Sequence, residues 1–245
     1  MPDKTYLVGS GKGGVGKSTV SVNLAIALAK SGKKVGLLDA DIFGPSIPIM
    51  MGLRRLTPQT VKLEEKERVL PFEKFGIKTI SIGSFLEESQ AGVWRGPLIS
   101  NLLSKLLNDV DWGELDTLLI DLPPGTGDVP ITLSQLCKID GALIVTTPQE
   151  VAVLDAMKMI NALDQLQIPL SGIIENMAGF KTSDKTHHIF GQGRGKLLAE
   201  RFQSPFLGSL PFLPLLQEGS DEGIPPAFSN REVANLFARI ASAFA

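Results

Sequence analysis

Glycines, two lysines and two hydroxyl side chains are spaced along residues 11–19 in the pattern G-x-x-x-x-G-K-[ST]. The segment lies between a predicted strand and a predicted helix, the context in which this pattern forms a loop around phosphate groups. Glycine permits a tight turn that points backbone N–H groups at phosphate oxygens, and the positive end of the following helix adds to the attraction. The residues predicted to contact the phosphates are Gly11, Lys12, Gly13, Gly14, Val15, Gly16, Lys17, Ser18 and Thr19.

Two side chains of this loop are expected to act on the charged end of a nucleotide. Lys17 would bridge the β- and γ-phosphates of ATP, and the Ser18 hydroxyl would bind the accompanying Mg²⁺. A glycine-rich turn without a ligand is the alternative, and the strand–loop–helix context disfavours it. The pattern therefore predicts an ATPase.

Two acidic residues come at the end of another predicted strand, in the run VGLLDAD. The carboxyl ends of parallel strands meet at one edge of a sheet, so Asp39 and Asp41 should lie near the phosphates. Hydrolysis needs a group that positions water, and Mg²⁺ needs oxygen partners. We assign Asp41 to the attacking water and Asp39 to support of the Mg²⁺ shell. Capping of a turn would explain either acid alone, but it explains the two together less well.

The segment Leu118–Asp121 is an apolar strand that ends in a third acid. Downstream of a phosphate loop, this pattern predicts that Asp121 holds Mg²⁺ through water. The residues Pro123–Asp128 follow, and we expect them to form the switch that senses the γ-phosphate.

Short β-prone runs alternate with segments of helical length along the chain. This alternation predicts an α/β fold of the P-loop NTPase kind, a mostly parallel β-sheet with helices on both faces, in a single domain over residues 1–245. The predicted strands are Thr5–Gly9, Lys34–Asp39, Lys78–Gly83, Thr117–Asp121, Gly141–Thr147, Ser171–Asn176 and Pro205–Leu210. The predicted helices are Ser18–Ser31, Pro97–Leu107, Val151–Leu166, Gly195–Phe202 and Asn230–Ala243.

Two polar stretches lack such a pattern. Leu53–Lys74 is rich in charge, and we interpret it as an insertion or a mobile connection. Its charged run Glu64–Arg68 favours a solvated face over a binding site. The second irregular stretch is Lys181–His188.

Composition narrows the class of protein. Apolar residues make up 43% and charged residues 20% of 245 residues, a balance typical of a globular protein. The net charge of -2 argues against a protein that coats nucleic acid. The chain reaches the phosphate loop within ten residues, without a secretory signal, and no apolar run could span a bilayer. With a single cysteine as well, we expect a cytoplasmic protein without stable membrane insertion.

Several longer motifs resemble the Mrp/ApbC family of MinD-like ATPases, which belong to the deviant Walker A, SIMIBI-class P-loop proteins. The phosphate loop matches the form K-G-G-x-G-K-[ST] of this group, and the resemblance covers nearly the whole chain. The further matching motifs are Asp39–Ser46, Trp94–Pro97, Trp112–Asp116, Asp121–Asp128, Glu175–Met177, Ile189–Gly191 and Ser220–Gly223.

The resemblance implies roles for three further residues. Lys12 matches the lysine that reaches across a nucleotide-sandwich homodimer to the partner's phosphates. Asn176 matches an asparagine that contacts adenine, and the segment around Pro211 matches one that flanks the base. Alone, Lys12 is equally compatible with a solvent-facing side chain.

Members of this family are implicated as iron–sulfur cluster carriers, most of them with a C-x-x-C between the Asn-Met and Ile-Phe-Gly motifs. This chain has Lys181–His188 there and no cysteine, so the usual cluster site is absent. Hydroxyl and carboxylate groups are poor replacements for thiolates. We interpret His187 and His188 as surface-loop residues rather than a metal pair, and Cys137, at the end of a predicted helix, as a buried thiol.

Three classes of function are compatible with these motifs. The leading hypothesis is a homodimeric Mrp/ApbC-type ATPase, with ATP and Mg²⁺ as cofactors, that serves iron–sulfur cluster assembly or delivery to an apo-protein or scaffold partner. The second is a MinD- or ParA-like positioning ATPase on membrane or DNA, which the weakly basic segment Ser229–Ala245 disfavours. The third is a nucleotide switch without turnover, which the paired acids Asp39 and Asp41 disfavour.

Overall fold

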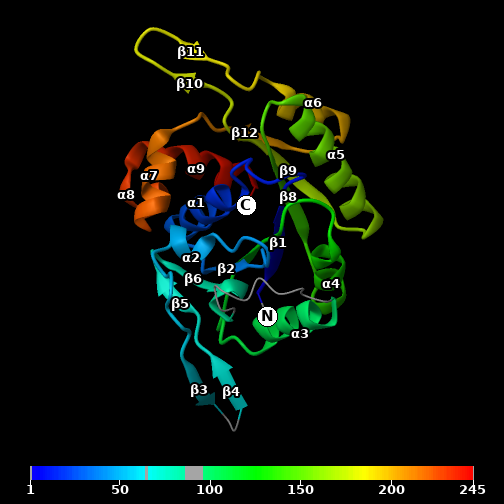
Figure 1. Ribbon diagram of the computed structural model, residues 1–245, viewed down its shortest axis with the longest axis vertical. Helices are drawn as coiled ribbons and strands as arrows, with labels where there is room; N and C mark the ends of the chain where they lie inside the picture. Colours follow the sequence, from blue (N-terminus) through cyan, green and yellow to red (C-terminus); the bar gives the residue numbers. More distant parts are fainter. Residues whose placement is uncertain (1, 64–65, 86–95, 245) are drawn as a thin grey trace.

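The structure is a computed structural model that describes residues 2–63, 66–85 and 96–244. An eight-stranded sheet runs through its centre (Figure 1), in the order β12-β9-β8-β1-β7-β2-β6-β5. Neighbouring strands are parallel except at the edge, where β5 runs antiparallel to β6. The strands are β1 (Lys4–Gly9), β2 (Val35–Asp39), β5 (Phe72–Lys74), β6 (Ile77–Ser81), β7 (Thr117–Asp121), β8 (Gly141–Thr146), β9 (Leu170–Glu175) and β12 (Phe206–Ser209).

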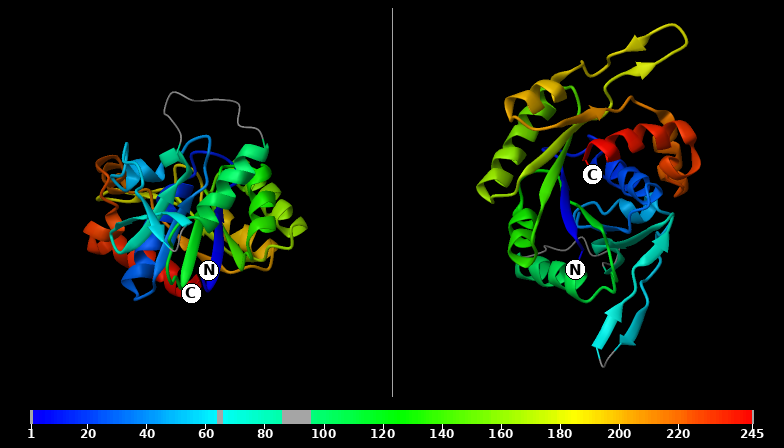
Figure 2. Two further views of the ribbon diagram at one scale, coloured as in Figure 1. Left: turned by 90° about the horizontal axis from the view of Figure 1, so that it is seen from below. Right: turned by 180° about the vertical axis from the view of Figure 1, so that it is seen from behind.

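Helices cover both faces of this sheet (Figures 1 and 2), as the sequence predicts. One face packs against α1 (Lys17–Lys30), α2 (Ile47–Met50), α7 (Pro214–Glu222), α8 (Pro226–Ser229) and α9 (Arg231–Phe244). The other face packs against α3 (Gly96–Asn108), α4 (Asp128–Leu136), α5 (Glu150–Gln165) and α6 (Arg194–Arg201). Within the described residues, no helix has the length and apolar character needed to cross a membrane.

The apolar strands are buried because both of their faces are covered. All six residues of β8 are buried, and on β2 the side chains of Leu37 and Leu38 enter the cores on opposite faces. Such burial explains why these strands are continuously apolar instead of alternating. The apolar runs therefore predicted the strands, and the seven predicted strands and five predicted helices are observed with small shifts at their ends.

The segment Leu53–Lys74, interpreted as an insertion or a mobile connection, contains strands that the sequence did not predict. The segment contains the hairpin of β3 (Thr60–Leu63) and β4 (Lys66–Val69), followed by the edge strand β5. The hairpin projects from one end of the molecule, and a smaller hairpin of β10 (Phe180–Lys181) and β11 (Thr186–His187) projects from the other (Figure 1). Among the strand residues of the two hairpins whose burial is described, none is buried, so no buried face gives these sequences an apolar period. Trp94 and Arg95, part of one motif, lie outside the described residues.

Candidate functional site

The phosphate loop lies at the carboxyl end of β1 and leads into α1. Gly14 and Gly16 have φ angles of 83° and 85°, which glycine adopts without strain. Gly11 needs the absence of a side chain for a different reason, because a Cβ atom there would lie 2.0 Å from the backbone of Asp155 in α5. A cavity of about 270 Å³ opens above the loop, and its lining includes Lys12, Lys17, Ser18 and Asp41. The local fold thus forms an open cradle of backbone N–H groups.

Lys17, Ser18 and Asp121 converge beneath this cradle. The Lys17 ammonium and the Ser18 hydroxyl each donate to Asp121 Oδ2, both at 2.6 Å. The other carboxylate oxygen of Asp121 accepts a hydrogen bond from Ser21 Oγ at 2.5 Å. Asp121 is fully buried and Lys17 is 6% exposed, so this ion pair is shielded from water. The structure therefore brings together the lysine, hydroxyl and acid that the sequence predicts around a metal-bound phosphate.

Asp39 lies beside Asp121 because β2 and β7 are neighbours in which these two residues are paired. The Asp39 carboxylate is fully buried and accepts hydrogen bonds from Asp41 N at 3.1 Å and from Ser81 Oγ at 2.9 Å. Burial, together with the neighbouring Asp121 carboxylate, raises the pKa of Asp39 to about 8. A cation bound next to these two acids would offset the cost of holding both charges in a buried place.

Stability of the nucleotide-free chain is expected to fall as pH rises from about 4 to about 8. In this range the folded chain keeps a proton on Asp39 that the unfolded chain has released, because the folded pKa is about 8 and the ordinary value 3.8. This one group contributes a slope of up to about 1.4 kcal/mol per pH unit, which disappears above the folded pKa. Denaturant titrations without Mg²⁺ should give a flatter profile for Asp39→Asn, and equal slopes would contradict the assignment.

Asp41 faces the cavity from the loop that follows β2. Its Oδ1 atom accepts hydrogen bonds from Phe43 N at 3.2 Å and from Gly44 N at 3.1 Å, which leaves Oδ2 for a water molecule. Burial raises the pKa of Asp41, while the charge of Lys17 opposes this shift. The side chain is thus held in place by its own loop, with one oxygen available to orient a nucleophile.

Lys12 also lines the cavity, and its ammonium donates to Gln149 Oε1 at 3.3 Å. Gln149 directly precedes α5, whose second turn packs against Gly11. The distance is near the upper limit for a hydrogen bond, so little free energy holds Lys12 in this position.

Asn176 and Pro211 lie at the carboxyl ends of the neighbouring strands β9 and β12. The buried Asn176 amide donates to the carbonyl of Val15 at 2.9 Å, so it braces the phosphate loop. The segment around Pro211 is joined to the segment after Asn176 by bonds from Ala178 N to Leu210 O and from Phe212 N to Gly179 O. Neither Asn176 nor Pro211 lines the cavity above the phosphate loop.

Sequence reasoning missed three residues that hold this site together, Ser21, Ser81 and Gln149. Ser21 had a usable signal, because it lies four residues after Lys17 and therefore on the same side of α1. Ser81 and Gln149 act on residues far away in the sequence, so only the order of the strands brings them into contact with Asp39 and Lys12.

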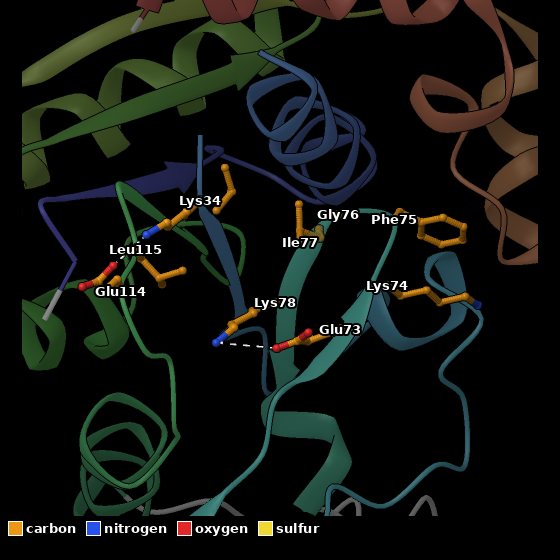
Figure 3. Close-up of a pocket in the computed structure, with 10 residues that line it drawn as sticks. Lys34, Glu73, Lys74, Phe75, Gly76, Ile77, Lys78, Glu114 and Leu115 are labelled. Carbon is orange, nitrogen blue, oxygen red and sulfur yellow. Dashed lines mark hydrogen bonds and ion pairs between the residues drawn. The ribbon is translucent and has the colours of Figure 1, made fainter. Parts of the chain in front are cut away.

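A larger cavity, of about 590 Å³, lies at the opposite edge of the sheet, at the amino ends of β2 and β6 (Figure 3). Two ion pairs flank it, Lys34–Glu114 at 2.7 Å and Lys78–Glu73 at 3.6 Å. Four of the five charged side chains that line the cavity are therefore paired with one another, and the fifth, Lys74, donates to Met51 O at 2.8 Å. None of them belongs to the predicted site. The chemistry predicted from the sequence lies at the carboxyl edge, and we place the candidate site there.

The residues considered for a cluster are dispersed. His187 lies on β11, and His188 Nδ1 is 2.9 Å from the carbonyl oxygen of Ala178. Cys137 directly follows α4 and is half-buried rather than buried as predicted, and this partial burial raises the pKa of its thiol. Among the described residues, no group of three or more His, Cys, Asp or Glu side chains is arranged to hold a metal ion. Mg²⁺ bound with a nucleotide needs no such group, because phosphate oxygens and water supply most of its ligands.

Known proteins match nearly the whole chain. A family model described as "NUBPL iron-transfer P-loop NTPase" matches residues 2–245. The iron-sulfur cluster carrier protein of Aquifex aeolicus is 48% identical over 239 residues, which are 96% of this chain and 65% of that protein's length. The chain therefore spans less than two thirds of this relative.

Solved structures give the same result for the fold. A nucleotide-binding protein from Archaeoglobus fulgidus in complex with ADP is 42% identical, with a TM-score of 0.77 over 90% of this chain and 86% of that one. The cell division ATPase MinD of Pyrococcus furiosus shares the fold at 21% identity, with a TM-score of 0.69 over 98% of each chain. The expected MinD-like P-loop NTPase fold is confirmed.

Proposed function

We infer the function from one premise: the chain belongs to the family of NUBPL iron-transfer P-loop NTPases. We propose that it binds Mg-ATP, hydrolyses the β–γ phosphoanhydride and uses an ATP-dependent homodimer to control assembly or delivery of iron–sulfur clusters. The observation that carries the nucleotide part of this proposal is the convergence of Lys17 and Ser18 on the buried Asp121, both at 2.6 Å, beneath the phosphate loop.

The donor set fits Mg-ATP. Oxygen atoms of Ser18 and Asp121 lie within hydrogen-bond distance of each other, and oxygen ligands suit Mg²⁺. When bound, Mg²⁺ neutralises charge on the phosphates. Ser18 would bind it directly, Asp121 through water, and the buried Asp39 would support that water shell. The Archaeoglobus protein is in complex with ADP, which supports nucleotide binding by this chain.

The remaining side chains of the site would each act in nucleotide binding or hydrolysis, as their positions allow. Lys17, now paired with Asp121, would turn its ammonium to the β- and γ-phosphates. Asp41 would orient the attacking water through Oδ2, because backbone N–H groups already occupy Oδ1. Lys12 would leave Gln149 and supply positive charge to the phosphates held by a second copy of the chain. Asn176 and the segment around Pro211 would flank the base.

The cluster is the cargo in this proposal, and it needs a site other than the usual one. The printed name of the Aquifex relative supports a role with clusters. Lys181–His188 has no cysteine, so we propose control of delivery to a scaffold or apo-protein partner rather than storage in this segment. Reconstitution with iron and sulfide, followed by absorption spectroscopy, distinguishes control of delivery from storage. Absorption bands of a thiolate-ligated cluster in the isolated chain would contradict a role limited to control of delivery.

Asp41→Ala is expected to keep ATP binding and to slow hydrolysis by about a hundredfold or more, because the change removes the water-orienting oxygen and leaves the cradle intact. The variant should then accumulate as an ATP-bound dimer. Single-turnover hydrolysis and light scattering of the same samples measure both effects, with Asp184→Ala, on the exposed turn between β10 and β11, as a control. Hydrolysis at the wild-type rate would show that another group orients the water.

A further inference from the structure

Ser81 is buried on β6, the strand next to the one that carries Asp39. It ends β6, it is 2% exposed, and its hydroxyl donates to Asp39 Oδ2 at 2.9 Å. The hydroxyl oxygen of Ser81 also accepts a hydrogen bond from Gly83 N at 3.0 Å. Because Gly83 N–H can only donate, the serine proton is directed to Asp39 Oδ2 when Asp39 is ionised, as it would be next to Mg²⁺. The orientation of this hydroxyl is therefore fixed from both sides.

The constraint continues from Asp39 to Asp41. The second oxygen of Asp39 accepts the backbone N–H of Asp41 at 3.1 Å, so the carboxylate that Ser81 holds also fixes the start of the loop carrying Asp41. Asp41 in turn binds the backbone of Phe43 and Gly44 through Oδ1. A movement of the Asp39 carboxylate would therefore shift the backbone from which Asp41 reaches the cavity.

Close packing also joins the turn after β6 to the loop that carries Asp41. A Cβ atom on Gly83 would lie 2.7 Å from Cβ and Cγ of Pro45, so the turn after β6 lies directly against the loop after Asp41. The hydrogen bonds of Ser81 and the packing of Gly83 thus both restrain the loop that carries Asp41. Ser81 is placed where its hydroxyl can set the geometry of both acids.

We propose that Ser81 is a positioning residue of the hydrolytic site, which holds the Asp39 carboxylate for the Mg²⁺ shell and, through Asp39, holds Asp41 for the attacking water. The proposal rests on the proposed function and adds a residue to it. Ser81 does not line the cavity, so it acts only through these acids. Removal of the Ser81 hydroxyl should weaken Mg²⁺ binding and slow ATP hydrolysis. It should leave the contacts of the phosphate loop with the nucleotide unchanged.

The test compares Ser81→Ala with Ser220→Ala. Ser220 is also a buried serine with a satisfied hydroxyl, but its partner is Leu216 O within α7. Affinity for a fluorescent ADP analogue is measured with EDTA and with Mg²⁺, followed by the maximal rate of ATP hydrolysis and the thermal midpoint. Ser81→Ala should bind the analogue with wild-type affinity in EDTA. The increase in affinity that Mg²⁺ causes should be about fivefold smaller than in the wild type, and ATP hydrolysis should be about tenfold slower. Ser220→Ala should change only the thermal midpoint of unfolding.

Two results would overturn the proposal. One is a wild-type response of Ser81→Ala to Mg²⁺ together with wild-type turnover. The other is an equal loss of affinity in EDTA and in Mg²⁺, which would make Ser81 a general support of the fold. A wild-type chain that neither binds Mg-nucleotide nor hydrolyses ATP would refute the proposed function instead, so the two failures are distinguishable.

Discussion

Lys17→Ala is expected to weaken Mg-ATP binding by about a hundredfold or more. Lys17 is the buried charged residue of the phosphate loop, and we propose that its ammonium contacts the phosphates. Loss of such a charge-assisted contact costs about 2–5 kcal/mol. Backbone N–H groups and Ser18 remain in the variant, but they cannot replace a full positive charge between two phosphates.

The same change has a second consequence in the nucleotide-free chain. Lys17 pairs with Asp121 at 2.6 Å, and breaking a buried ion pair leaves its partner uncompensated. Asp121 keeps the hydrogen bonds from Ser18 and Ser21, so we expect a lowered thermal midpoint rather than loss of the fold. Binding and stability therefore have to be measured on the same preparation.

Calorimetric titration with Mg-ATP, alongside thermal unfolding, gives both quantities. Lys30→Ala is the matched control, because Lys30 ends the same helix and also donates to backbone carbonyls, those of Ala227 and Phe228. The control should bind Mg-ATP like the wild type. Unchanged affinity in a folded Lys17→Ala chain would overturn the assignment of the phosphate loop.

The sequence predicted the parts of the site that depend on local pattern. Residues 11–19 carry the phosphate loop as a continuous motif, and Asp39 and Asp121 each end a continuously apolar strand. Because parallel strands align their carboxyl ends, the expectation that these acids lie close together needed no knowledge of strand order. Their direct pairing does depend on that order, since β2 and β7 are neighbours although a long stretch of chain separates them.

The remaining features depend on contacts that no local pattern reports. The hairpin of β3 and β4 extends away from the core, and none of its strand residues whose burial is described is buried, so no apolar period marks them. Ser81 could be placed on a strand, but its bond to Asp39 follows from the pairing of β2 with β6. Likewise, Gln149 meets Lys12 only because β8 lies beside β1.

Lys12→Ala is expected to bind ATP and to fail in dimerisation and hydrolysis, because the charge of Lys12 acts on the phosphates of a second chain. In the part of the chain that the structure describes, the ammonium of this lysine has a single hydrogen bond to give up, that of 3.3 Å to Gln149 Oε1, so reaching across an interface costs little. Gln149→Ala distinguishes this arrangement from a role within one chain. If Lys12 works with Gln149 on its own phosphates, hydrolysis should fall in Gln149→Ala; if it works in trans, hydrolysis should be unchanged or faster.

Mixing Lys12→Ala with Asp41→Ala provides the decisive measurement. In a mixed dimer, the nucleotide bound by the Lys12→Ala chain meets an intact Asp41 of its own chain and an intact Lys12 of the other. Each variant alone should be inactive, and an equal mixture should recover hydrolysis, because each mixed dimer has one complete site of two. If the intact Lys12 of one chain is enough for the two variants to pair at random, half of the dimers are mixed and the rate is about one quarter of the wild-type rate. If Lys12 acted in cis, neither chain would hold a complete set and mixing would restore nothing. Hydrolysis by Lys12→Ala that sediments as a monomer would contradict the trans role, and the sandwich homodimer would lose its basis.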